Sequence, residues 1–233
     1  MFTAQEIARM MDLTAVRPDS DEAEVRALAE AAKKYQCLCA CTLPSQTPLL
    51  LELLAGEPHT SVVGAVGFPS GAHTTRIKVA EARELLGMGC GELDMVINIG
   101  LLRSGQYRCA LDDVRAVVDA AAGATVKVIL ECHYLSKYEI RKGCELCIEA
   151  GASFVKTSTG WAPTGATLEN VALIKECVGD GLLVKAAGGI RSLDTLVEMY
   201  RLGARRFGVG VTSAIHMFEE VLHADHPRRS DTG

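Results

Sequence analysis

Apolar positions along this chain follow two alternating patterns. Short and nearly continuous apolar runs, such as Ser61-Val-Val-Gly-Ala-Val-Gly-Phe, are typical of strands buried on both faces of a parallel sheet. Between these runs, apolar residues recur every three or four positions, as they do along one face of a helix. The pattern predicts eight strands, at residues 10–14, 37–42, 61–68, 92–98, 125–131, 153–156, 182–186 and 205–209.

Glycines and capping residues mark where the intervening helices end and begin. Before four of the strands stands a glycine, which readily takes the left-handed backbone that ends a helix. These glycines are Gly89, Gly123, Gly151 and Gly203. The residues expected to cap helix starts are Asp19 and Ser20, Ser136 with Glu139 in capping-box spacing, Thr167 and Ser192.

The repeated order of helix, glycine and strand predicts an α/β protein, a (β/α)8 TIM barrel in a single domain. We expect the barrel domain to span residues 1–223, with a short lid helix at 3–9, and the polar tail at 224–233 to be disordered. An open doubly wound sheet is the alternative, but it usually carries a glycine fingerprint after its first strand. The segment Asp12-Leu-Thr-Ala-Val-Arg has no such fingerprint.

Charge and cysteine content narrow the classes of function. The formal net charge is -5 and both signs are dispersed, which argues against a nucleic-acid partner. Nine cysteines without metal-ligand spacing favour neither a disulfide framework nor a zinc site, and they indicate the reducing cytosol. Cys37, Cys39 and Cys41 alternate, as small apolar thiols do in a buried strand. With no signal peptide and no long apolar run, we expect a cytoplasmic protein that binds no membrane.

Lys156 lies within an apolar strand, in Phe154-Val-Lys-Thr-Ser-Thr-Gly. Burial disfavours the ammonium form of lysine and lowers its pKa from about 10.4. Lys185 has similar surroundings on the next strand, roughly 4.8 Å away between backbones. Two ammonium groups facing each other in a partly dry cavity would make one of them lose its proton more easily. The resulting neutral amine can attack a carbonyl and form a Schiff base.

Asp94 on the fourth strand can lie near Lys156, because alternate strands contribute side chains to the same layer of a barrel. A carboxylate there can move protons through the carbinolamine and the imine. The alternative is an internal ion network at the barrel mouth that performs no chemistry. Lys127 and Glu131 on the fifth strand leave both possibilities open, since they could neutralise each other and orient Lys156.

Glycine-rich turns near the end of the chain indicate an anion site. Gly160, Gly188 and Gly189 can expose backbone N–H groups, and Gly208-Val-Gly-Val-Thr-Ser precedes a predicted helix whose dipole could be directed at a phosphate. Arg191 could add charge, although a solvated position at a helix start is its commoner role.

Several other polar residues have two possible roles. Asp12 and Thr14 could bind a substrate hydroxyl or form a buried capping pair, and Trp161 could cover the pocket or simply pack. His73 and His133 have no evident partner, so we expect them to be polar loop residues rather than catalytic ones.

Seven motifs between Asp12 and Arg191 resemble deoxyribose-phosphate aldolase, and the match runs in order from about Asp12 to Gly208. They are Asp12-Leu-Thr, Cys41-x-x-Pro44, Gly67-Phe-Pro-x-Gly71, Glu92-Leu-Asp-Met-Val-Ile-Asn-Ile-Gly100, Lys127-Val-Ile-Leu-Glu131, Phe154-Val-Lys-Thr-Ser-Thr-Gly160 and Val184-Lys-Ala-Ala-Gly-Gly-Ile-Arg191. The resemblance implies a (β/α)8 barrel and a class I aldolase, a lyase that needs no metal or cofactor. Such an enzyme cleaves 2-deoxy-D-ribose 5-phosphate reversibly into glyceraldehyde 3-phosphate and acetaldehyde, in deoxyribonucleotide catabolism.

The resemblance also implies roles for residues. Lys156 would form the Schiff base, Lys185 would tune it, and Asp94 would relay protons. The implied substrate-binding residues are Asp12, Thr14, Cys41, Lys127, Thr157, Gly160, Gly188, Gly189, Gly210 and Val211. The implied partners are a small phosphosugar substrate and further copies of the chain, in a homodimer or a higher homo-oligomer.

One departure from the family bears on the substrate. Gly210 and Val211 stand where the family usually places serines that help hold the phosphate, and Thr212 and Ser213 follow. A related Schiff-base aldolase for a different or unphosphorylated acceptor is therefore a second hypothesis. The third is a catalytically silent metabolite-binding protein, which the retention of Lys156, Lys185 and Asp94 disfavours.

Overall fold

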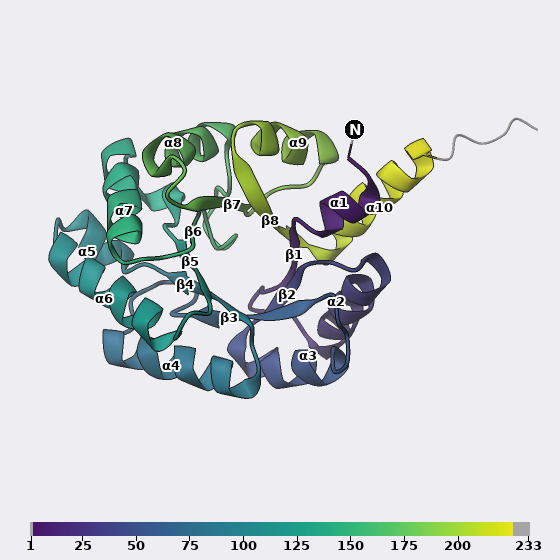
Figure 1. Cartoon of the computed structure of the whole chain (residues 1–233), viewed down its shortest axis with the longest axis horizontal. Coiled ribbons are helices and arrows are strands. Elements are labelled where there is room, and N and C mark those ends of the chain that lie inside the picture. Colours follow the sequence, from purple (N-terminus) through teal and green to yellow (C-terminus); the bar gives the residue numbers. More distant parts are fainter. Residues whose placement is uncertain (1, 226–233) are drawn as a thin grey trace, which may run out of the picture.

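A computed structural model describes residues 2–225 of the chain. Eight parallel strands form a closed barrel in sequence order, and the last strand pairs with the first (Figure 1). The strands are β1 (Met11–Ala15), β2 (Cys39–Thr42), β3 (Ser61–Val66), β4 (Glu92–Val96), β5 (Thr125–Ile129), β6 (Phe154–Lys156), β7 (Leu183–Ala187) and β8 (Ala204–Gly210). The predicted TIM barrel is thus confirmed, and the open doubly wound sheet is wrong.

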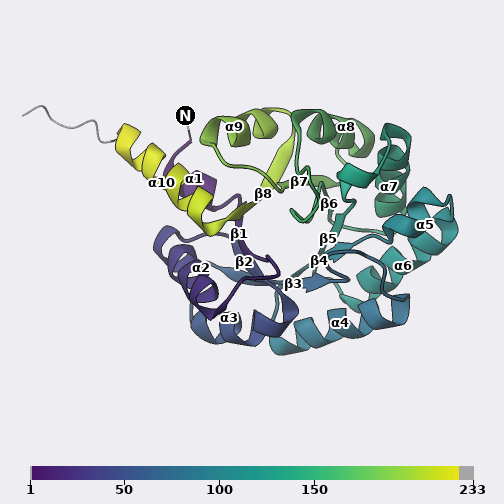
Figure 2. The same cartoon turned by 180° about the vertical axis from the view of Figure 1, so that it is seen from behind.

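Helices surround the barrel in both views (Figures 1 and 2). They are α1 (Ala4–Ala8), α2 (Glu22–Tyr35), α3 (Thr47–Leu53), α4 (Thr75–Met88), α5 (Ile99–Arg103), α6 (Tyr107–Ala120), α7 (Lys137–Glu149), α8 (Leu168–Val178), α9 (Leu193–Arg201) and α10 (Val211–Asp225), with short 3-10 turns η1 (Pro44–Gln46) and η2 (Cys132–Tyr134). The helix α10 continues past residue 223, where we had placed the end of the domain. The rest of the predicted tail, 226–233, lies outside the described residues. No helix within residues 2–225 is long and apolar enough to cross a membrane.

Most of the predicted helix boundaries are confirmed. Ser136 and Glu139 form the capping box of α7, and Thr167 and Ser192 cap α8 and α9. The start of α2 is a correction, because Asp21 is the capping residue: it has an extended backbone and its side chain accepts from the Glu24 N–H. The preceding residues serve the loop instead, where the Ser20 hydroxyl accepts a hydrogen bond from the Arg17 N–H.

The four predicted glycine turns all have left-handed backbones, with φ values of 116°, 95°, 77° and 111° at Gly89, Gly123, Gly151 and Gly203. Five strands, β2 to β6, are shorter than predicted, and the residues that follow β4 and β5 show why those two end early. β4 stops before Asn98, whose side chain caps α5, and β5 stops before Glu131, whose own backbone is left-handed at φ 57°.

The N-terminal helix is not a lid. Ile7 and Ala8 of α1 are fully buried, and α1 packs against α2 and α10 (Figures 1 and 2). It leads directly into β1, and the Met10 carbonyl accepts from the Phe207 N–H. The helix α1 therefore lies toward the amino-terminal ends of the strands, away from the loops that follow them.

The strands divide the molecule into an apolar shell and a charged interior. Outward-facing side chains such as Leu13, Leu93 and Val155 belong to the large core between the barrel and the helices. Charged side chains contact one another across non-adjacent strands, which is possible only through the interior of the barrel. Asp94 on β4 contacts Lys185 on β7, for example.

Candidate active site

Asp94 lies at the centre of the barrel interior and accepts hydrogen bonds from three lysines. Its Oδ1 lies 2.8 Å from the Nζ of Lys127, its neighbour in the β4–β5 register. Its Oδ2 lies 2.7 Å from the Nζ of Lys156 and 2.7 Å from the Nζ of Lys185. Lys156 and Lys185 are direct partners in the β6–β7 register, so parallel pairing places both amines on one carboxylate oxygen.

The environments of these two lysines differ. Burial lowers the pKa of Lys156, the Asp94 carboxylate opposes that change, and the Lys185 ammonium adds to it. Burial acts in the same direction on Lys185, but there Asp12 and Asp94 together outweigh it and raise the pKa. The lysine with the easily lost proton is therefore Lys156, while Lys185 remains a cation.

A second layer of charges lies beside these groups. The guanidinium of Arg206 donates to Asp12 Oδ1 at 2.9 Å and to Glu92 Oε1 at 3.2 Å. Lys127 Nζ lies 2.6 Å from Glu92 Oε2, and Lys185 donates to Asp12 Oδ2. We call these side chains together the interior ion network: Asp12, Glu92, Asp94, Lys127, Lys156, Lys185 and Arg206.

The interior ion network contains three carboxylates and four basic side chains. The pKa of Asp12 and that of Asp94 are both lowered by the surrounding cations, although burial alone would raise them. If Lys127, Lys185 and Arg206 are charged, a neutral Lys156 makes the network electrically balanced. An unbalanced charge in a dry interior is costly, so the network favours a deprotonated Lys156.

A cavity of about 300 Å³ opens above this network. Lys156 is 5% exposed and lines it, whereas Lys185 and Lys127 are fully buried and do not. Predicted site residues that line the cavity are Asp94, Lys156, Thr14, Cys41, Gly160, Gly188, Gly189 and Gly210. Predicted site residues that do not line it are Lys185, Asp12, Lys127, Thr157 and Val211. Asp12 binds Lys185 and Arg206, and Thr157 donates its hydroxyl to the Ala187 carbonyl at 3.1 Å.

The glycine turns and one helix start form one end of the cavity. Gly188 has φ 87°, and a Cβ there would lie 2.5 Å from the Ser158 hydroxyl, so only glycine fits. Gly189 has φ 76°. Gly210 immediately precedes α10, and Ser213 in the first turn of α10 also lines the cavity. Exposed N–H groups at a helix start suit an anion.

Two expectations about single residues need correction. Lys127 and Glu131 do not neutralise each other: Lys127 pairs with Glu92 and Asp94, whereas Glu131 accepts from the N–H and the hydroxyl of Thr159. Arg191 lines the cavity mouth rather than serving only as a solvated residue.

Trp161 lines the mouth of the cavity, as one of our two interpretations predicted. Its Nε1–H donates to the Val16 carbonyl at 2.7 Å, and its ring meets the Phe68 ring edge to face at 5.9 Å between centroids. His133 instead hydrogen-bonds Thr164 at 2.7 Å, and neither His133 nor His73 lines the cavity.

Several residues of the site were not predicted from the sequence. Arg17, Glu24, Phe68 and Thr159 line the cavity, and Glu92 and Arg206 complete the interior ion network. Strand alternation could have identified Glu92, because it lies two positions before Asp94 and so faces the same side. Arg17 and Glu24 carried no local signal, since charged residues in a loop and a first helical turn are common.

One set of potential metal ligands, Asp12, Cys39 and Glu92, lies within 4.8 Å among the described residues. Its donors are already taken by basic side chains: Arg206 contacts all three residues, and burial raises the pKa of the Cys39 thiol. A divalent cation here would meet the charges of Arg206 and Lys127, so this donor set does not fit a metal.

Comparisons with known proteins agree with this geometry. The family model for DeoC/LacD family aldolases matches residues 7–218. The deoxyribose-phosphate aldolase of Klebsiella pneumoniae subsp. pneumoniae is 46% identical over 229 residues, which cover 97% of this chain and 91% of that protein. The deoxyribose-phosphate aldolase of Sinorhizobium medicae is 46% identical over 216 residues, covering 93% and 87%.

Solved structures include a close match in fold and sequence. The deoxyribose phosphate aldolase of Aeropyrum pernix, described as a unique tetrameric structure, has a TM-score of 0.86 and 30% identity, and the match covers 95% of this chain and 93% of that one. With the charged barrel interior, the lysine at the cavity floor and a family match over nearly the whole sequence, the chain belongs to the DeoC/LacD family of aldolases.

Proposed function

We propose that this protein is a class I aldolase that reversibly cleaves 2-deoxy-D-ribose 5-phosphate into D-glyceraldehyde 3-phosphate and acetaldehyde. The observation that carries the proposal is the Lys156 amine, which is buried at the cavity floor and shares one oxygen of Asp94 with Lys185. The relatives named above as deoxyribose-phosphate aldolases support the same substrate.

Lys156 acts as the nucleophile. Its neutral amine adds to the C1 aldehyde of the open-chain sugar, and loss of water from the carbinolamine gives a protonated imine. Asp94 moves the protons in these steps, since its Oδ2 lies 2.7 Å from the Lys156 Nζ. Lys185 holds that same oxygen and keeps a positive charge beside the amine.

The protonated imine then serves as the electron sink. The C3 hydroxyl loses its proton, the bond between C2 and C3 breaks, and glyceraldehyde 3-phosphate leaves. The remaining enamine takes a proton at C2, and hydrolysis of the imine releases acetaldehyde and restores the Lys156 amine. We assign the proton transfers to Asp94 and to water that enters through the cavity.

The phosphate binds where the cavity meets the glycine turns. Gly188 and Gly189 supply backbone N–H groups, and the start of α10 at Val211 directs its positive end toward the same region. Ser213 and Arg191 line this part of the cavity and contribute a hydroxyl and a charge. Thr14, Cys41 and Gly160 form walls around the sugar.

Further proposals concern the setting of the enzyme. It acts without a metal or cofactor, because the Schiff base supplies the electron sink. It works in the cytoplasm, in the catabolism of deoxyribonucleotides, and assembles as a homo-oligomer. A relative described as tetrameric supports the last point.

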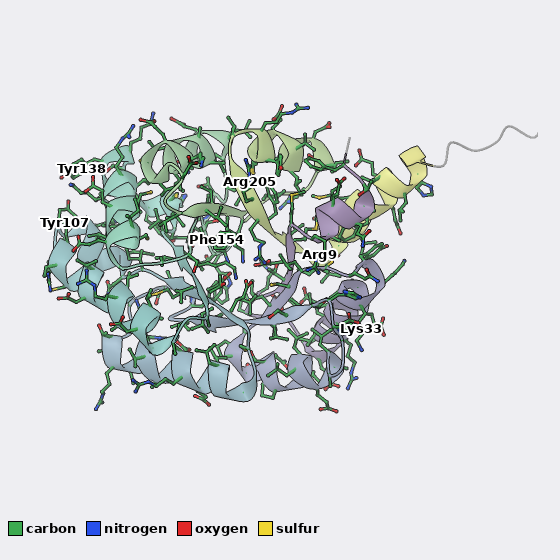
Figure 3. All side chains as sticks on the ribbon, viewed as in Figure 1. Arg9, Lys33, Tyr107, Tyr138, Phe154 and Arg205 are labelled. Carbon is green, nitrogen blue, oxygen red and sulfur yellow. The ribbon has the colours of Figure 1, made fainter. Side chains whose placement is uncertain are left out.

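Borohydride trapping tests the proposed function. Reduction in the presence of deoxyribose 5-phosphate is expected to leave a covalent mass increment on the peptide that contains Lys156. The variant Lys156→Ala is expected to show no increment and no retro-aldol activity. Lys33→Ala is the matched control, because Lys33 is exposed on α2, far from the barrel interior (Figure 3). An unmodified parent protein would refute the mechanism.

A second candidate is an aldolase for an unphosphorylated acceptor. Gly210 and Val211 offer no hydroxyl at the phosphate end, and the Glu24 carboxylate lines the cavity, where it would repel an anion. Equal kcat/KM for deoxyribose and its 5-phosphate would favour this candidate. A strong preference for the phosphate would exclude it. If Lys156→Ala behaves like the parent in every binding and activity assay, the protein is instead a catalytically silent metabolite-binding protein.

A further inference from the structure

Arg206 is a buried charged residue and Glu92 a half-buried one, and the proposed reaction uses neither. Arg206 is 7% exposed, and neither residue lines the cavity. The guanidinium spans two carboxylates, Asp12 and Glu92, and lies 5.5 Å from the centroid of the Phe154 ring. Figure 3 shows Phe154 within the barrel. These residues therefore cannot contact the substrate, and any effect on the reaction must pass through other groups.

Two chains of contacts lead from this pair to the reactive amine. Arg206 contacts Asp12, which accepts from Lys185, and Lys185 donates to Asp94. On the other side, Glu92 contacts Lys127, which donates to the other oxygen of Asp94. Both chains end at the carboxylate that holds Lys156.

Arg206 determines how these contacts are shared. Arg206 partly neutralises Asp12 and Glu92, so the positive charges of Lys185 and Lys127 can neutralise Asp94. Asp94 then has two permanent cations and does not require an ammonium on Lys156. Without Arg206, the Asp12 and Glu92 carboxylates would attract the Lys185 and Lys127 ammonium groups more strongly. The three carboxylates would be balanced only if Lys156 kept its proton.

We propose that Arg206 and Glu92 are positioning residues that set the charge of the barrel interior so that the Lys156 amine is uncharged when substrate arrives. This inference rests on the proposed function and names residues beyond those that touch the substrate. In the interior ion network, the positive charge of Arg206 on β8 allows the Lys156 amine on β6 to lose its proton.

Other groups face the Lys156 amine and must be considered. Cys41 on β2 is a neutral thiol, since burial raises its pKa to about 12. Glu131, just beyond β5, is bound by Thr159, makes no ion pair with the described residues within 4 Å, and has a pKa that burial raises. Asp94, Lys127 and Lys185 complete the surroundings. None of the variants below changes Cys41 or Glu131, whereas Lys127 and Lys185 are the groups through which the variants act on Asp94.

The test is a direct titration of Lys156 in the parent and in four variants. Competitive labelling of amines at a series of pH values, followed by mass spectrometry of the Lys156 peptide, reports its protonation without needing turnover. The pH profile of kcat/KM is measured in parallel. Arg206→Met is expected to move the Lys156 titration up by about one pH unit and to lower kcat/KM near pH 7 about tenfold. Glu92→Gln removes a negative charge and is expected to move the titration in the opposite direction.

The double variant Arg206→Met, Glu92→Gln restores the balance of charges and is expected to return the titration toward that of the parent. Arg205→Met is the matched control. Arg205 precedes Arg206 on β8 but points outward (Figure 3), where it donates to the Tyr200 and Ala204 carbonyls. If Arg206→Met does not fold, Arg206→Lys keeps the charge and is expected to titrate near the parent, with the double variant tested beside it.

Two results would overturn the inference. One is a Lys156 titration that stays in place in Arg206→Met while activity falls, which would mean a purely structural role. The other is a double variant no closer to the parent than Arg206→Met. Failure of the proposed function is separate, because it would appear as a parent protein that forms no borohydride adduct.

Discussion

Two regions of this protein bury a lysine beside an aspartate, and they differ in how the aspartate is shared. In the helical layer, Lys78 of α4 is fully buried and its Nζ lies 2.6 Å from Asp113 of α6 and 2.9 Å from the Val96 carbonyl. In the barrel interior, Asp94 serves three lysines. Burial lowers the pKa of both Lys78 and Lys156, and an aspartate opposes it in each case.

Both lysines are buried, so burial is not what distinguishes them. Among the described residues, Lys78 is the one cation that pairs with Asp113, whose other oxygen accepts from the Thr75 hydroxyl, and Lys78 does not line the cavity above the interior ion network. Lys156 shares Asp94 with two permanent cations and lies at the floor of an open cavity. Competition for one carboxylate, together with access for substrate, distinguishes the lysine that we propose as catalytic from the structural one.

The largest expected effect comes from removing Lys156, the lysine that shares Asp94 with other cations. Lys156→Met is expected to lower the retro-aldol rate at least about 10³-fold, because the nucleophile is lost. It leaves three carboxylates with three cations, so the melting temperature is expected to stay close to that of the parent. A coupled assay with deoxyribose 5-phosphate and a thermal melt measure the two effects. Substantial residual activity would contradict the role of Lys156.

Removing Lys78 is expected to have the reverse result, a loss of stability without a loss of Lys156 reactivity. Lys78→Met leaves Asp113 as a buried and unpaired charge, which lowers the free energy of unfolding by about 3 kcal/mol. The borohydride adduct on Lys156 is expected to form as in the parent. Urea unfolding measures the loss, and the double variant Lys78→Met, Asp113→Leu is expected to recover part of it. An unchanged unfolding midpoint would show that this pair is not a structural counterpart of the network.

The protonation of Lys156 is expected to set the acid limb of the pH profile. Because its pKa in the folded protein is lowered, the neutral amine is lost as pH falls through that value, and kcat/KM falls with it. The unfolded chain keeps this proton to higher pH, so the free energy of unfolding rises with pH between the folded and unfolded pKa values. Lys156→Met is expected to reduce that slope. A pH-independent kcat/KM would contradict the assignment.

The smallest effect concerns the far end of the cavity. A Cβ at Gly210 would meet nothing within 4 Å, and its backbone is not left-handed, so Gly210→Ser fits without strain. The added hydroxyl is expected to lower KM for the 5-phosphate about threefold to tenfold and to leave kcat for unphosphorylated deoxyribose unchanged. Gly87→Ser, in open space on α4, is the control. No change in KM would place the phosphate elsewhere.

Much of the fold was predictable because it depends on local patterns. The eight apolar runs are strands, and the four glycine turns and three of the predicted helix caps are confirmed. Errors occurred where a neighbouring residue competes for the same role. Asp21 rather than Asp19 or Ser20 caps α2, since only its side chain reaches the Glu24 N–H. The short helix α1 gave no signal of which end of the barrel it covers.

For the site, the sequence by itself determined that the side chains of Lys156, Lys185 and Asp94 point into the barrel. A charged residue in an apolar strand must face something other than the apolar shell. Only the tertiary structure decided how they are partnered. Glu131 lies beyond the end of β5 on a left-handed backbone, so its side chain reaches Thr159 instead of Lys127. Arg206 reaches Asp12 and Glu92 because closure of the barrel places β8 beside β1 and opposite β4. Local spacing along the chain determines the direction of a side chain, whereas the sharing of charges depends on distances between strands that are far apart in sequence.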